Sequence, residues 1–162
     1  MLLPPSPIWY DATPQGKLTQ TQDEFELAKQ FLQKDSEDYE RNQSDRGFIH
    51  KILAAGTTAD KLSTLTLLAQ QSPIHNTKAL QSLVQLGQKK SRSEALKALR
   101  AFADWWSAGG APNRKLRYWA DQPAKATSDA ERILFYFEDW LKKLFWNVLQ
   151  TLEVCASQQM SK

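Results

Sequence analysis

The chain has 162 residues, of which 41% are apolar and 24% charged, and its formal net charge is +3, as expected of one soluble domain. One cysteine, Cys155, excludes an internal disulfide, and a chain of this length can bury a core without a metal. The first ten residues lack a signal-peptide pattern, and the longest apolar run, residues 133–137, is too short to span a bilayer. We therefore expect a reducing compartment, either the cytosol or the nucleus.

The charge is distributed unevenly along the chain. Residues 1–50 carry a net charge of −4, residues 51–127 carry +8, and residues 128–162 carry −1. A basic middle region favours a polyanionic partner, although a solvated basic helix face gives the same count.

The N-terminal residues 1–20 are predicted to form an extended, proline-rich arm, because three of the first seven residues are prolines. Ile8, Trp9 and Tyr10 follow these prolines and together offer a large apolar surface. Leaving this surface in water is costly, so we expect the arm to dock either on its own domain or on a partner.

Residues 21–162 are predicted to form a single domain of amphipathic helices. A capping box at Thr21 and Glu24 begins the first helix, and residues 35–45 are compatible with either a solvated helix or a linker. Ser44 is the expected cap of the next helix, which ends at Gly56 in a left-handed turn.

Capping signals divide the remainder into further helices. Thr58 is the expected cap of the next helix, and Ser91, with a glutamate three positions on, opens another that ends before Gly109. The last helix begins at Ser128 and has apolar residues on more than one face, which predicts burial on two sides. The fold class expected is all-α, with stacked antiparallel hairpins of HEAT or armadillo type.

The sequence offers little for catalysis or metal binding. His50 and His75 lie 25 residues apart, with no further ligand at zinc spacing, and Cys155 lacks a neighbour that would activate its thiol. We expect no enzyme activity, no metal and no cofactor.

Two adjacent carboxylates on the last helix have a structural explanation. Glu138 and Asp139 are each followed four residues later by a lysine, Lys142 and Lys143. We interpret these pairs as surface ion pairs rather than as an acid and base.

Basic residues and aromatic rings gather in one part of the sequence. Tyr118 and Trp119 follow eight basic side chains, which are Lys89, Lys90, Arg92, Lys97, Arg100, Arg114, Lys115 and Arg117. This combination is typical of proteins that track an RNA backbone, and the alternative is a solvated face beside core aromatics.

Four segments together are recognisable. They are GTTADKLSTLTLLAQQSPIHNTKAL at residues 56–80, KKSRSEALKAL at 89–99, NRKLRYW at 113–119 and FYFEDWLKKLFWNVLQTLE at 135–153. In this order, and with the LLPPSPIWY arm before them, they resemble the N-terminal region of the CCAAT-binding-factor family of nucleolar complex proteins. The sequence departs from the family pattern at residues 109–112, where larger apolar residues are expected.

The resemblance implies a non-enzymatic assembly factor of the large (60S) ribosomal subunit, located in the nucleolus and built from HEAT-like repeats. It further implies pairing with nucleolar complex protein 2, contact with pre-ribosomal RNA and pre-60S proteins, and a longer full-length protein. The family name reflects a transcription role as well. No residue-level site comes with the resemblance, so RNA contact through the basic residues and a purely protein-docking scaffold both stay open.

Overall fold

A computed structural model of the chain describes residues 1–11 and 22–160. Its described residues form helices and no strands, which confirms the all-α class. The main helices are α1 (Gln22–Arg41), α2 (Arg46–Ala55), α3 (Thr58–Gln71), α4 (Thr77–Leu86), α5 (Arg92–Trp105) and α6 (Asp129–Met160). Three short helical segments, η1 (Trp9–Asp11), η2 (Trp106–Gly110) and η3 (Trp119–Asp121), complete the secondary structure. No helix in the described ranges combines the length and apolar character needed to cross a bilayer.

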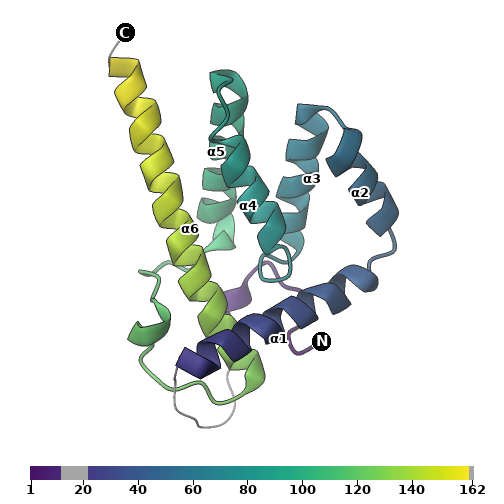
Figure 1. The fold of residues 1–162 in the computed structure, drawn as a ribbon, viewed down its shortest axis with the longest axis vertical. Helices are drawn as coiled ribbons and strands as arrows, with labels where there is room; N and C mark the ends of the chain where they lie inside the picture. The colour runs from purple at the N-terminus through teal and green to yellow at the C-terminus, as the bar shows by residue number, and fades with distance from the viewer. Residues whose placement is uncertain (12–21, 161–162) are drawn as a thin grey trace.

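The helices form a row with one helix across its base. Helices α3, α4, α5 and α6 run in alternating directions, and α2 closes the opposite end of the row from α6 (Figure 1). Helix α1 crosses beneath this row and packs against α6, while α3, α4 and α5 pack on one another. Short connections between α2, α3, α4 and α5 impose the antiparallel arrangement of these helices, whereas the longer segment 106–128 joins α5 to α6.

Helix α1 continues to Arg41, so residues 35–41 are helical rather than a linker. Its inward face is a stripe at helical spacing, made of Ala28, Leu32, Asp35 and Tyr39, all of them buried. The expected cap Thr21 lies outside the described residues. The helix therefore buries one carboxylate among three apolar side chains.

Two of the predicted helix boundaries are displaced by a single residue. The N-cap of α2 is Asp45 rather than Ser44, and that of α3 is Thr57, whose hydroxyl accepts a hydrogen bond from the Asp60 amide at 3.2 Å. Gly56 is extended, with φ −72°, and is not in the predicted left-handed turn. A glycine suits this position because a Cβ would lie 2.6 Å from the carbonyl oxygen of Ile52.

Of the two capping residues predicted later in the chain, Ser91 and Ser128, only one forms a capping hydrogen bond. Ser91 occupies the N-cap of α5, but its side chain makes no capping bond there, and Glu94 instead accepts a hydrogen bond from the Thr58 hydroxyl at 3.2 Å. Ser128 does cap α6, because its hydroxyl accepts from the Glu131 amide at 3.2 Å. Helix α5 is thus tied at its start to the start of α3.

One main apolar cluster joins the arm to the helices. It contains Leu3 and Trp9 from the arm, Leu99, Phe102 and Trp105 from α5, and Ile133, Phe137, Leu141, Leu144 and Val148 from α6. A second, smaller cluster consists of Leu65, Leu68, Ala79 and Leu83, with Ile49 and Leu53 of α2 packed against it. The row therefore has its larger core at the α6 end.

The C-terminal half of α6 is buried on one side only, contrary to the prediction from its sequence. Val148 and Leu144 face the core, whereas Trp146 is 60% exposed and Leu149 40% exposed. Because α6 is the outermost helix of the row (Figure 1), no other described helix covers this face.

Candidate functional site

The N-terminal arm docks on its own domain through Trp9. The Trp9 indole is 4% exposed, donates a hydrogen bond to the Gly110 carbonyl oxygen at 2.9 Å and meets the Phe137 ring edge-on at 4.9 Å. The Tyr10 hydroxyl donates to the Gly109 carbonyl oxygen at 3.0 Å. Ile8, by contrast, is 42% exposed and contributes little to the contact. In this structure Trp9 and Tyr10 of the arm therefore contact the chain's own domain.

The glycine pair that receives the arm is required by geometry. Gly109 has φ +112°, a conformation that other residues rarely adopt. A Cβ on Gly110 would lie 2.3 Å from the Trp105 ring, which is itself buried. The two glycines at 109–110 thus form a close-packed seat whose two carbonyl oxygens accept the hydrogen bonds from Trp9 and Tyr10.

A buried polar network holds the start of the arm against α1. Asp35, 2% exposed, accepts hydrogen bonds from the backbone amides of Leu2 and Leu3. Its carboxylate also lies 2.7 Å from Nε2 of His75, and Nδ1 of that ring lies 2.7 Å from the Ser72 hydroxyl. Every polar group in this network has a partner, as burial demands.

The same three residue types form catalytic triads in hydrolases. Here the Ser72 side chain is fully buried, and His75 is covered by the stacked Tyr39 ring at 4.9 Å. A nucleophile must reach a substrate, so this geometry assigns Ser72, His75 and Asp35 to the attachment of the arm. The described residues also hold no group of three or more His, Cys, Asp or Glu side chains suited to a metal ion.

The predicted basic residues separate into two groups. Lys89, Lys90, Lys97 and Arg100, which we call the α5 basic group, are exposed in the α4–α5 turn and along α5. Arg114, Lys115 and Arg117 follow the other end of α5, which is about 20 Å long at 1.5 Å per residue. The eight side chains therefore do not form one continuous patch.

Two of the predicted arginines make structural bonds. Arg92 donates to the Cys155 carbonyl oxygen at 3.0 Å and so ties α5 to α6, and the adjacent Gln88 donates to Asn147 at 3.1 Å. Arg114 pairs with the buried carboxylate of Glu138. Neither guanidinium is as available to a phosphate as the ammonium groups of the α5 basic group.

Of the two surface ion pairs predicted on α6, only one pairing forms. Asp139 and Lys143 pair at 2.7 Å, but Asp139 is buried rather than at the surface, and Glu138 does not pair with Lys142. Glu138 is 3% exposed and accepts hydrogen bonds from Arg114, from the Arg117 amide and from the Gln122 side chain. This carboxylate therefore anchors the connection between η2 and α6, and the sequence spacing could not reveal it.

The ring of Trp119 is buried in that connection. It is 8% exposed and meets Phe25 of α1 at 5.4 Å, as the core alternative for this residue predicts. Tyr118 is 39% exposed, and the Lys142 ammonium lies 4.4 Å from its ring centre. Only Tyr118 of this pair presents an aromatic surface beside the basic residues.

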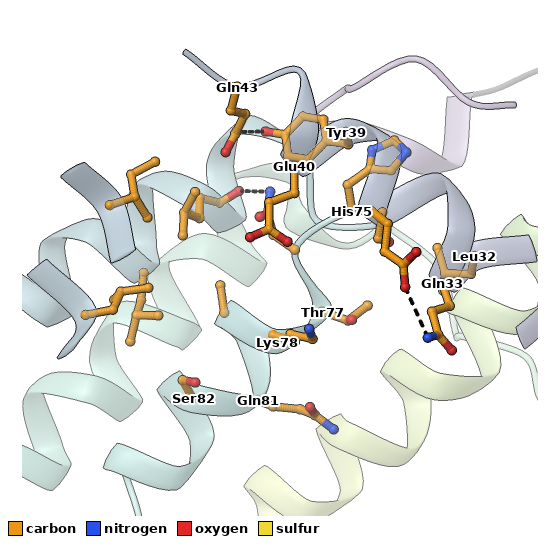
Figure 2. A pocket seen from close by; sticks show the side chains of 18 of the residues that line it. Leu32, Gln33, Tyr39, Glu40, Gln43, His75, Thr77, Lys78, Gln81 and Ser82 are labelled. Atoms are coloured by element: carbon orange, nitrogen blue, oxygen red, sulfur yellow. Dashed lines mark hydrogen bonds between the residues drawn. The ribbon is translucent and has the colours of Figure 1, made fainter. Parts of the chain in front are cut away.

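A cleft of about 470 Å³ opens between α1, α2 and α4 (Figure 2). Its interior is formed by apolar side chains, including Leu32, Ile49, Leu53, Leu65 and Leu68. Lys78, Gln81 and Ser82 line it from α4, Gln33 and Glu40 line it from α1, and Gln43 lines it from the connection between α1 and α2 (Figure 2). This volume lies within the range of ligand-binding cavities.

Ionisable groups at the mouth of the cleft are linked to one another. The Glu40 carboxylate lies 2.7 Å from Nε2 of His50 and 3.5 Å from Arg46. The hydrogen bond from His50, together with the positive charge of Arg46, lowers the pKa of Glu40 despite partial burial. Tyr136 at the α6 end of the cleft has a raised pKa because burial disfavours its phenolate.

Sequence reasoning missed the cleft and the Asp35 network. A usable signal for Asp35 exists, because it occupies one position of the stripe Ala28, Leu32, Asp35 and Tyr39 and is therefore expected inside. The cleft has no such signal, since its walls come from helices whose angles the sequence does not specify.

Comparison with known proteins gives several relatives. The chain is 35% identical to "Ribosome biogenesis protein NOC1" of Chaetomium thermophilum over 82% of its length, and 35% identical to an uncharacterized protein of Schizosaccharomyces pombe over 80%. It is 29% identical to human "CCAAT/enhancer-binding protein zeta" over 96% of its length. The alignments cover 15%, 16% and 17% of these relatives, respectively. No protein-family model matches the chain.

Proposed function

Since the chain belongs to the CCAAT-binding-factor family that includes ribosome biogenesis protein NOC1, we propose that it is a non-enzymatic helical scaffold in ribosome biogenesis. The observation that carries this proposal is the 35% identity to that biogenesis protein over 82% of the chain. We place its action in the nucleolus, on precursors of the large ribosomal subunit. Nucleolar complex protein 2 and pre-60S proteins are the protein partners proposed.

The architecture supports a scaffold role. Antiparallel helices in a row present long exposed faces, as HEAT-like arrays do, and we propose that α2–α6 are part of such an array. The exposed apolar side chains Trp146 and Leu149 on α6 are of the kind found where proteins meet.

Contact with pre-ribosomal RNA is assigned to the α5 basic group. Lys89, Lys90, Lys97 and Arg100 are exposed, and no ion pair holds their charges within the described residues. Each cation that neutralises a phosphate releases counterions, which makes affinity steeply dependent on salt. Lys115 and Arg117 extend this basic character to the far end of α5.

The test compares two triple variants of equal charge change. One replaces Lys89, Lys90 and Lys97 by Gln, and the control replaces the exposed Lys34, Lys51 and Lys125 by Gln. Arg92 is kept because it bonds to α6. Affinity for a fluorescein-labelled ribosomal RNA hairpin is measured by anisotropy from low to moderate salt. We expect the first variant to bind more weakly, with a salt slope shallower by about 0.7–0.9 per lost contact, and the control to resemble the parent.

Equal affinity and slope in both variants and the parent would contradict RNA contact and leave the protein-docking scaffold as the better explanation. The alternative is a transcription-associated CCAAT-binding factor, and it rests on the name of the human relative, "CCAAT/enhancer-binding protein zeta". Preference for a duplex carrying CCAAT over a scrambled duplex, in the same assay, would favour that alternative.

A further inference from the structure

The cleft between α1, α2 and α4 is not used by the RNA contact proposed above. We propose that it binds a short acidic peptide segment of a partner protein, which inserts one or two bulky apolar side chains. The apolar lining, the volume and the charges at the mouth each bear on this assignment.

The interior of the cleft is suited to apolar side chains. Leu65 and Leu68 form its floor, and Ile49 and Leu53 of α2 remain half-buried beside them. An inserted leucine or aromatic side chain would remove this remaining apolar surface from water, which is the main favourable term in recognition of a peptide by a groove. The volume of about 470 Å³ suits a few side chains rather than a folded domain.

The charged side chains at the mouth of the cleft indicate which charge a bound partner should carry. The Glu40 carboxylate is paired with His50 and Arg46, and the Glu37 carboxylate accepts a hydrogen bond from Gln33 at 3.2 Å. Lys29 and Lys78 also line the cleft, and neither takes part in a hydrogen bond or ion pair within the described residues, although the positive charge of Lys78 contributes to lowering the pKa of Glu40. Three cationic side chains, Lys29, Arg46 and Lys78, thus line the cleft against the two carboxylates of Glu37 and Glu40. The net charge of the lining is positive, and acidic side chains placed beside the apolar anchors near Lys29 and Lys78 complement it.

The same mouth disfavours a nucleic acid. A phosphate backbone carries a charge at every nucleotide, and a strand crossing the cleft would pass close to the carboxylates of Glu37 and Glu40. A peptide can place single carboxylates near Lys29 and Lys78 and leave neutral residues beside the two glutamates. The observations thus favour a peptide over RNA as the occupant.

The experiment begins with selection from a displayed library of random 16-residue peptides, using the 162-residue chain as bait. Binders are then counter-selected against the double variant Lys29→Glu, Lys78→Glu. We expect the enriched peptides to carry Leu, Phe or Trp flanked by Asp or Glu. Enrichment of basic sequences, or of none that distinguish the parent from the double variant, would overturn the proposal.

Affinity of one enriched peptide is then measured by fluorescence anisotropy. Lys29→Glu with Lys78→Glu should weaken binding by about tenfold or more, as loss and reversal of charge pairs at an interface does. The matched control, Lys34→Glu with Lys51→Glu, changes exposed lysines outside the cleft and should leave affinity unchanged. Circular dichroism verifies that both variants keep the parent's helicity.

Equal weakening in the two variants would mean a general charge effect and would refute a cleft-specific site. Competition between the peptide and the ribosomal RNA hairpin, with RNA affinity lowered only by the cleft variant, would assign the cleft to RNA instead. The proposal holds only if the peptide binds without loss of RNA binding. Its failure would leave the RNA contact through the α5 basic group unaffected.

Discussion

Trp9 is the residue on which attachment of the arm depends. Its indole combines burial, an edge-on contact with Phe137 and a hydrogen bond to the Gly110 carbonyl oxygen. The neighbouring Ile8 is also apolar but is 42% exposed, against 4% for Trp9. The two residues therefore make a matched pair for measuring what docking contributes to stability.

Replacing Trp9 by Ala should destabilise the protein by up to about 3–5 kcal/mol, the range for removing a large buried aromatic side chain. Ile8→Ala should change stability by no more than about 0.5 kcal/mol, because its side chain is exposed. Urea unfolding followed by circular dichroism measures both. A Trp9→Ala variant as stable as the parent would mean that the docked arm adds nothing to the fold.

For single residues, the sequence predicts the chemical character of a side chain better than it predicts which residue that side chain contacts. An indole beside prolines indicates docking, but the seat at Gly109 and Gly110 lies about 100 positions away and depends on how the Trp105 ring is turned. Glu138 illustrates the same limit, because four-residue spacing indicated Lys142 while the folded chain supplied Arg114. Local spacing carries no information about segments that fold back from elsewhere.

Among the elements, the connection between η2 and α6 is organised by one side chain of α6. Glu138 accepts hydrogen bonds from Arg114, from the Arg117 amide and from Gln122. The Lys142 ammonium adds a hydrogen bond to the Leu116 carbonyl oxygen at 2.7 Å. A segment with little regular structure is in this way fixed to a helix.

Glu138→Ala should release this connection and lower stability by about 1.5–3 kcal/mol, as expected when hydrogen bonds to a charged group are lost. Trypsin cleaves after Lys and Arg, so cleavage at Arg114, Lys115 and Arg117 should become faster. The control Glu153→Ala removes an exposed carboxylate of the same helix. Equal digestion patterns for the two variants would contradict the anchoring role.

Taken as a whole, the molecule has an uneven distribution of apolar contacts. The main cluster links the arm, α1, α4, α5 and α6, whereas α2 contains no buried residue and packs chiefly on α3. Regions with few buried apolar contacts open at lower free energy. The α2 end of the row is therefore the less stable end, and it also forms one wall of the cleft.

Hydrogen exchange should reveal this gradient. Amides of α2 should exchange at least about tenfold faster than those of α4 and α5, because local opening of α2 exposes little apolar surface. Mass spectrometry of peptic fragments measures the difference. Protection of α2 equal to that of α5 would show that the row unfolds only as one unit.

Helical class and most helix positions could be predicted because apolar periodicity and capping residues are local signals. The transverse placement of α1 and the cleft beside it could not be, since they depend on packing between distant helices. The apolar width of α6 predicts burial on two sides, yet Trp146 is exposed. Apolar periodicity shows that a helix face is apolar, but it does not show which element covers that face.

The contact between Trp9 and Phe137 also determines when the arm can complete its packing during synthesis. Phe137 follows Trp9 by 128 positions, which a ribosome takes roughly 6–26 s to translate at about 5–20 residues per second. Throughout that interval the indole has been made but its ring partner has not. Trp9 therefore completes its core contacts only after α6 has been made, and a chain terminated before α6 leaves the indole without the Phe137 ring.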